Sequence, residues 1–106
     1  MTTFKTVIVG TKFRGAVAVE AAGRLRKGDA LRLERQPDNR HDRNAIAVYF
    51  GGVIIGYIPR IVNPRIAPLM DRGDQMEAVV DAPAQMDRGK IVIEPKITVF
   101  QKAVVS

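Results

Sequence analysis

The chain contains 106 residues, of which 46% are hydrophobic and 26% charged, and this length and composition predict one globular domain over residues 1–106. Because the sequence has no cysteine, disulfides, thiolate zinc sites and a cysteine nucleophile are excluded. Seventeen Lys and Arg residues against eleven Asp and Glu residues give a formal net charge of +6, which indicates either a solvated basic surface or a polyanionic partner such as nucleic acid.

The N-terminal part of the chain predicts two strands and one helix. Residues 4–9 are rich in β-branched and aromatic side chains and predict a strand. The Ala-rich segment 16–25 predicts a short helix, whose end is weakened by Gly23. A turn is expected at 27–29, and the alternation of apolar and charged residues over 30–35 predicts a half-buried strand after it.

The middle of the chain predicts a polar loop followed by a hairpin. Residues 36–44 contain several strong turn formers and predict an ordered surface loop. Two apolar segments, 45–50 and 53–58, flank Gly51-Gly52, and this pattern is typical of a β-hairpin with a two-residue turn. The polar loop therefore leads directly into the first strand of the hairpin.

The C-terminal part predicts a second short helix and two more strands. Asn63 followed by Pro64 is typical of an N-cap and a first helical residue, and Gly73 predicts the end of that helix. Residues 75–80 and 90–100 predict strands, and a proline within the second segment restricts it to a sheet edge or a bulge. About six short strands with two short helices predict a mainly β fold, a small OB-like β-barrel, because such a barrel hides its sheet edges.

The residue types needed for common enzyme and metal sites do not occur in a suitable pattern. There is no P-loop, and because His41 is the only histidine, a His-rich metal site is excluded. Asp38, Asp42 and Asn44 superficially resemble a calcium loop, but the glycine and closing glutamate are missing, and Asx-turns explain them better. We expect a non-catalytic protein without a cofactor. Its apolar segments are too short to span a membrane, so no membrane partner is expected. The absence of cysteine suits a reducing compartment, and a cytoplasmic location is expected.

Aromatic and cationic residues occur together at three loops or loop edges, namely residues 12–14, 40–43 and 57–60. Aromatic faces beside Arg and Lys are the components of a single-strand platform, on which bases stack and phosphates are neutralised. A place in the core is the alternative for the phenylalanine of the first segment, and an ordinary surface position is the alternative for the histidine. The candidate nucleic-acid-binding residues are Lys12, Phe13, Arg14, Arg40, His41, Asp42, Arg43, Tyr57 and Arg60.

These segments resemble the HIRAN domain. The resemblance extends over residues 7–80, and its most specific part is a P-x-N-x-x-D-x-N-A-I-x-V segment followed by G-Y-x-P-R. HIRAN domains occur at the N-terminus of eukaryotic fork-remodelling ATPases and as short stand-alone proteins in bacteria. The resemblance implies a stand-alone, bacterial-type OB-like barrel that captures the 3′-hydroxyl end of single-stranded DNA. The segments that carry it are Val9–Gly15, Gly28–Leu33, Pro37–Val48 and Ile55–Arg60.

The resemblance also implies roles for individual residues. Lys12 and Phe13 match a loop with a phosphate contact and a stacking aromatic, and His41 matches a second stacking position. Asp42 matches a carboxylate that accepts a hydrogen bond from the terminal hydroxyl. Phe13 and His41 stand where the well-studied eukaryotic domains have Tyr, and the first loop is one residue shorter, so weaker binding is expected. The backbone-phosphate patch implied by the resemblance comprises Tyr57 and Arg60.

Two functions from different classes follow from these observations. The first is a DNA-end-binding module in DNA repair or replication-fork processing, which acts alone or with a separately encoded helicase, ATPase or nuclease. The alternative is a protein-interaction adaptor, because small barrels are often reused for this purpose and a basic face suits an acidic partner. Retention on a single-stranded DNA column that decreases with salt separates the first function from the second.

Overall fold

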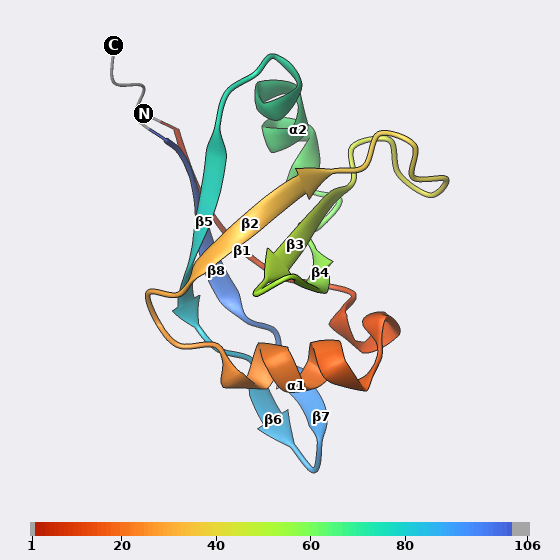
Figure 1. Cartoon of the computed structure of the whole chain (residues 1–106), viewed down its shortest axis with the longest axis vertical. Helices are drawn as coiled ribbons and strands as arrows, with labels where there is room; N and C mark the ends of the chain where they lie inside the picture. Colours follow the sequence, from red (N-terminus) through yellow and green to blue (C-terminus); the bar gives the residue numbers. More distant parts are fainter. Residues whose placement is uncertain (1, 103–106) are drawn as a thin grey trace.

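The computed structural model describes residues 2–102, and its main element is a curled sheet of six antiparallel strands in the order β1-β8-β5-β2-β3-β4 (Figure 1). The mainly β, OB-like fold with two helices is thereby confirmed, as an incompletely closed barrel. Two additional strands form a separate hairpin. The main sheet consists of β1 (Thr3–Val7), β2 (Ala30–Arg35), β3 (Ile46–Phe50), β4 (Val53–Tyr57), β5 (Met76–Ala82) and β8 (Lys96–Gln101), and the hairpin of β6 (Gln85–Asp87) and β7 (Lys90–Ile93).

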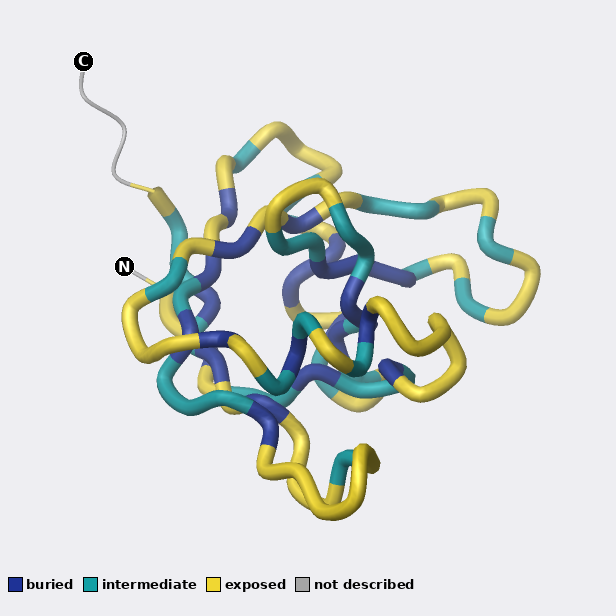
Figure 2. The backbone as a smooth tube through the Cα atoms, turned by 60° about the horizontal axis from the view of Figure 1, so that its bottom comes forward, coloured by how far each residue is buried: buried dark blue, intermediate teal, exposed yellow. Residues whose placement is uncertain are grey.

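The core lies inside the curled sheet, and the strand sequences explain why. In β2, Leu31 and Leu33 are buried while Arg32 and Glu34 are exposed, because successive side chains of a strand point to opposite faces. The same alternation buries Met76, Ala78 and Val80 of β5 and Ile97 and Val99 of β8. Figure 2 shows the buried residues gathered around the centre of the molecule and the exposed residues mainly in the peripheral loops.

The two helices lie at opposite ends of the sheet (Figure 1). Helix α1 (Ala16–Arg24) packs against β4 with Ala18 and Ala22 buried. Helix α2 (Asn63–Asp71) contributes the buried Ile66 and Ala67. Within the described residues, no helix is long and apolar enough to cross a membrane.

The sequence prediction was wrong at three places in the C-terminal half. Val62 is the N-cap of α2, and Asn63 is the first helical residue. No side chain makes a capping hydrogen bond at this end of the helix. Segment 90–100 forms two strands, β7 and β8, with Pro95 between them. Pro95 is buried, and its carbonyl accepts a hydrogen bond from the Ile8 amide at 3.0 Å. Strand β6 was not predicted, so the described residues contain more strands than expected. The other boundaries differ from the prediction by one or two residues.

Candidate nucleic-acid interface

A single backbone bridge brings two of the three predicted site segments, residues 12–14 and 57–60, close together. Val9, just after β1, and Tyr57, at the end of β4, donate to each other's carbonyls at 2.9 Å. Gly10 follows with φ 75°, a left-handed conformation, and turns the chain into the short 3-10 helix η1 (Thr11–Arg14). The buried Thr11 hydroxyl donates to the carbonyl of Ile55 at 2.6 Å. The turn that carries Lys12, Phe13 and Arg14 is therefore fixed to β4.

Gly56 is required for this close approach. Its φ is 151°, and a Cβ placed there would lie 2.5 Å from Ile8 Cγ2 and 2.6 Å from the carbonyl oxygen of Val9. Contacts this short cannot be relieved without moving the backbone. The glycine of the G-Y-x-P-R segment therefore allows the end of β4 to lie directly against the residues that follow β1, the other outer strand of the sheet.

Phe13 lies at the surface and not in the core. Its exposed fraction is 80%, and the Nζ atom of Lys12 lies 5.0 Å from its ring centroid. Within η1, Thr11 is buried against β4, whereas Lys12, Phe13 and Arg14 are exposed. The ring is thus available for contact with a ligand.

The polar loop 36–44 is ordered by its own side chains, as the Asx-turn interpretation predicts. The Asn39 side-chain carbonyl accepts from the amide of His41 at 2.9 Å, and Asp42 Oδ1 accepts from the amide of Asn44 at 2.9 Å. Figure 1 shows this loop, between β2 and β3, extending from the same side of the sheet as η1.

Tyr57 connects the loop to the closure bridge. Its hydroxyl donates to Gln36 Oε1 at 3.0 Å, and the same oxygen accepts from Asn39 Nδ2 at 3.2 Å. Tyr57 was predicted to be part of the backbone-phosphate patch, and its hydroxyl already donates within the protein. Gln36 and Asn39 were not among the predicted site residues, although both lie in the segment that the prediction singled out as a polar loop.

Arg35 anchors the base of the loop and was also not predicted as part of the site. It donates to the carbonyls of Ala45 at 2.8 Å and Arg43 at 3.0 Å, and it forms a two-pronged ion pair with Asp71 of α2, with donor–acceptor distances of 2.9 and 3.2 Å. The hydrogen bond from Arg35 lowers the pKa of Asp71. One arginine at the end of β2 thus ties the end of the loop to α2.

Asp42 has the most highly organised side chain of the site. Its Oδ2 accepts a hydrogen bond from Asn63 Nδ2 at 2.7 Å, and Arg60 Nε lies 3.7 Å from the same oxygen. Arg60 also donates to the carbonyl of His41. The pKa of Asp42 is lowered mainly by the hydrogen bond from Asn63, with further contributions from the Asn44 amide and from Arg60, against a raising effect of burial. The carboxylate, 19% exposed, is therefore ionised at neutral pH.

Most of the predicted residues line one open pocket of about 350 Å³ between η1, the polar loop and the end of β4. Asn39 and Asn63 also contribute to its wall. Lys12, Arg40 and Arg43 are exposed but outside this lining. The predicted residues that line the pocket are Phe13, Arg14, His41, Asp42, Tyr57 and Arg60.

The chemistry of the pocket combines one anionic acceptor with cationic and aromatic groups. Arg14 and Arg60 can neutralise phosphate, and Phe13 and His41 have ring faces suitable for stacking. Asp42 can accept hydrogen bonds from hydroxyl or amino donors, because a carboxylate has more lone pairs than its present partners use. Among the described residues, no group of three or more His, Cys, Asp and Glu side chains is placed to hold a metal ion.

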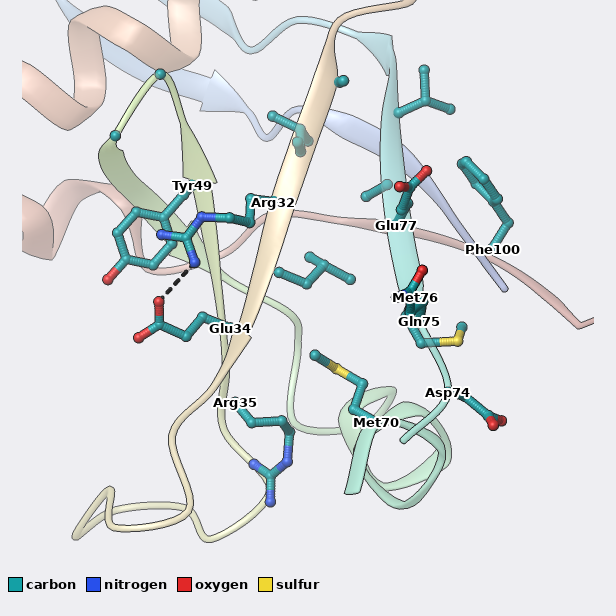
Figure 3. A pocket seen from close by; sticks show the side chains of 17 residues that line it. Arg32, Glu34, Arg35, Tyr49, Met70, Asp74, Gln75, Met76, Glu77 and Phe100 are labelled. Atoms are coloured by element: carbon teal, nitrogen blue, oxygen red, sulfur yellow. Dashed lines mark hydrogen bonds and ion pairs between the residues drawn. The ribbon is translucent and has the colours of Figure 1, made fainter. Parts of the chain in front are cut away.

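A larger hollow of about 900 Å³ lies where β2 and β5 diverge (Figure 3). The two strands pair through Ala30 and Leu31 of β2 and separate beyond them. The charges on this wall are partnered, since Arg32 donates to Glu34 at 2.8 Å and its guanidinium lies 4.3 Å from the ring centroid of Tyr49. The predicted nucleic-acid-binding residues lie outside this lining, so the smaller pocket is the candidate site.

Comparisons with known proteins agree with the resemblance found in the sequence. The HIRAN domain profile matches residues 1–99. A Fanconi-associated nuclease 1 homolog of Oryza sativa subsp. japonica is 37% identical over 71 residues, which cover 63% of this chain and 7% of that protein. An Arabidopsis thaliana protein of the same name is also 37% identical over 71 residues. The chain thus spans about 7% of the length of these curated relatives.

Solved structures give the same result for the fold. The crystal structure of the HIRAN domain of human HLTF superposes with a TM-score of 0.69 at 23% identity, over 93% of this chain and 74% of that chain. The crystal structure of a protein from Lactobacillus plantarum gives a TM-score of 0.69 at 27% identity, over 95% of this chain and 100% of that chain. With the profile match over residues 1–99 and the curled sheet in common, the chain belongs to the HIRAN family of DNA-binding domains.

Proposed function

We propose that this protein binds the free 3′ end of single-stranded DNA and catalyses no reaction itself. In this proposal the terminal nucleotide enters the pocket between η1 and the polar loop, and the carboxylate of Asp42 accepts a hydrogen bond from the 3′ hydroxyl. Phe13 and His41 stack on the last bases. Phosphates are neutralised by the cations at and around the pocket, which are Lys12, Arg14, Arg40, Arg43 and Arg60.

The observation that supports this proposal most strongly is the ionised carboxylate of Asp42 within a basic pocket. A carboxylate repels phosphates, so on a DNA-binding surface it favours a ligand group that donates a hydrogen bond. A terminal sugar hydroxyl is such a donor, and the sugars of internal DNA nucleotides carry no free hydroxyl. The same charge excludes a 3′-phosphate, so one group provides both attraction to the correct end and rejection of the wrong one.

The proposal includes a cellular context. We infer that residues 1–106 act as a single HIRAN domain in the cytoplasm, in DNA repair or replication-fork processing, with a separately encoded helicase, ATPase or nuclease. The matching relatives are named as nuclease homologs and are much longer than this chain, which supports an association with a DNA-processing enzyme.

The test compares short oligonucleotides that differ only in their ends. We expect the wild-type protein to prefer a 3′-hydroxyl over a 3′-phosphate by about 1.5–3 kcal/mol, the range for a hydrogen bond to a charged group. The preference should collapse in Asp42→Asn, which removes the charge while keeping the size of the side chain. A circular single strand, which has no end, should bind weakly.

Two results would contradict the proposal in different ways. Equal binding of both ends by the wild type would leave a general single-strand binder. Absence of salt-dependent binding to any single strand would favour the protein-interaction adaptor instead.

A further inference from the structure

Asn63 is the most deeply buried polar residue in the described part of the chain, with an exposed fraction of 1%. Its Nδ2 donates to Asp42 Oδ2 at 2.7 Å, whereas its Oδ1 has no hydrogen-bond partner. The opposite orientation of the amide would place Oδ1 against a carboxylate oxygen, so the charge of Asp42 determines which end of the amide faces the pocket.

The stability of α2 does not explain an amide at this position. Asn63 does not cap the helix, because Val62 occupies the N-cap position. A buried polar atom without a partner is unfavourable, and an apolar side chain of similar size would avoid it. The interaction that the amide does make is with Asp42, a residue of a different element and 21 positions away in the sequence.

The two donors on Asp42 fix the direction of its carboxylate. The amide of Asn44 holds Oδ1 at 2.9 Å and the side chain of Asn63 holds Oδ2 at 2.7 Å, so the group cannot rotate without losing a hydrogen bond. The charged and titratable groups around it are Arg60, 3.7 Å away, and Arg35, which acts at longer range. Arg14, His41 and Tyr57 line the same pocket. Asn63 is the donor that comes from α2.

We propose that Asn63 is a positioning residue that determines the specificity of this pocket for a 3′ hydroxyl, an inference that rests on the function proposed above. A neutral amide holds the carboxylate in its ionised form and aims it, yet adds no positive charge. A Lys or Arg at the same position would also hold the carboxylate, but it would add a second cation to that of Arg60 and weaken further the charge that repels a 3′-phosphate. Asn63 thereby preserves both the acceptor and the repulsion.

The first test uses Asn63→Leu, which keeps the volume and removes the donor. We expect the ratio of 3′-hydroxyl to 3′-phosphate affinity to fall about five- to tenfold, as for the loss of one hydrogen bond. Salt-dependent affinity for a circular single strand should not change. The matched control is Thr98→Val, because the Thr98 hydroxyl donates to the carboxylate of Asp81 at 2.7 Å outside the pocket. This control should leave the ratio unchanged.

The second test needs no DNA and uses carbon NMR titration of the Asp42 carboxyl. In the wild type the midpoint should lie below the ordinary aspartate value of 3.8. In Asn63→Leu it should rise, because the hydrogen bond to the charged form is lost. If the wild type has no end preference, the proposed function fails, whereas the titration still decides whether Asn63 controls this carboxylate.

A third variant gives a pH-dependent rescue and also serves if Asn63→Leu does not fold. In Asn63→Asp two carboxylates lie at hydrogen-bond distance and share a proton at mildly acidic pH, so one again donates to the other. We expect its affinity for a 3′-hydroxyl end to be present at mildly acidic pH. That affinity should weaken at higher pH, where the pair loses the shared proton and the second negative charge repels the DNA. A preference and an Asp42 midpoint that stay at wild-type values in Asn63→Leu, or a pH-independent affinity for the 3′-hydroxyl end in Asn63→Asp, would overturn the inference.

Discussion

The backbones of Val9 and Tyr57 exchange two hydrogen bonds of 2.9 Å, and this bridge joins the segment after β1 to the end of β4. These strands are the two outer strands of the six-stranded sheet, so the bridge closes the curled sheet at one end. The turn with Phe13 follows one partner and the G-Y-x-P-R segment contains the other. Closure of the fold and assembly of the candidate site therefore depend on the same contact.

The bridge predicts a large effect of Gly56→Ala on stability. The new Cβ would meet Ile8 and the Val9 carbonyl, and this clash should cost about 1–3 kcal/mol in addition to the strain of the positive φ. Gly28→Ala is the matched control, because Gly28 also has a positive φ, 93°, but open space around the position of a Cβ. Urea unfolding should show a clearly larger loss for Gly56→Ala. Equal losses of unfolding free energy in the two variants would mean that Gly56 does not lie as close to Ile8 and Val9 in solution.

Phe13→Ala tests whether the exposed ring is a stacking platform. We expect single-stranded DNA binding to weaken by about 1–3 kcal/mol, the usual contribution of base–aromatic stacking. The Tm should stay nearly constant, because the side chain is 80% exposed and contributes little to the core. Fluorescence anisotropy with a labelled oligonucleotide and a thermal melt measure the two quantities.

Ile61→Ala is the control for Phe13, since Ile61 is 87% exposed and lies outside the pocket lining. It should change neither the affinity nor the Tm. A loss of Tm in Phe13→Ala, or an unchanged affinity, would remove the ring from the proposed interface.

The basic surface predicts a specific salt dependence. If about three phosphates are neutralised, the slope of log K against log salt should be near −2, from roughly −0.7 for each contact on a single strand. Lys12→Gln should make this slope shallower by about 0.7. Lys5→Gln lowers the net charge equally but lies on β1 and not on the η1 turn, so it should leave the slope nearly unchanged. A flat salt dependence, or equal effects of the two variants, would speak against phosphate contacts at this turn.

The sequence by itself determined much of the secondary structure and the family. Alternation over 30–35 and the Gly51-Gly52 turn depend on neighbouring residues only, so they can be recognised without knowledge of the fold. The exposure of Phe13 could also be anticipated, because a short segment between two glycines is a poor place to build a core. The Asx-turn at Asp42 is likewise local, as its partner Asn44 is two positions away.

The tertiary structure alone decided how these pieces meet. The neighbours of Asn63 in the sequence predict a helix cap, whereas in the fold Val62 is the N-cap and Asn63 donates a charge-assisted hydrogen bond to the carboxylate of Asp42 in a distant segment. Segment 90–100 appeared to be one strand, but Pro95 interrupts it. Contacts of this kind join residues far apart in the chain, and their energies depend on the path of the backbone in space, which no local pattern contains.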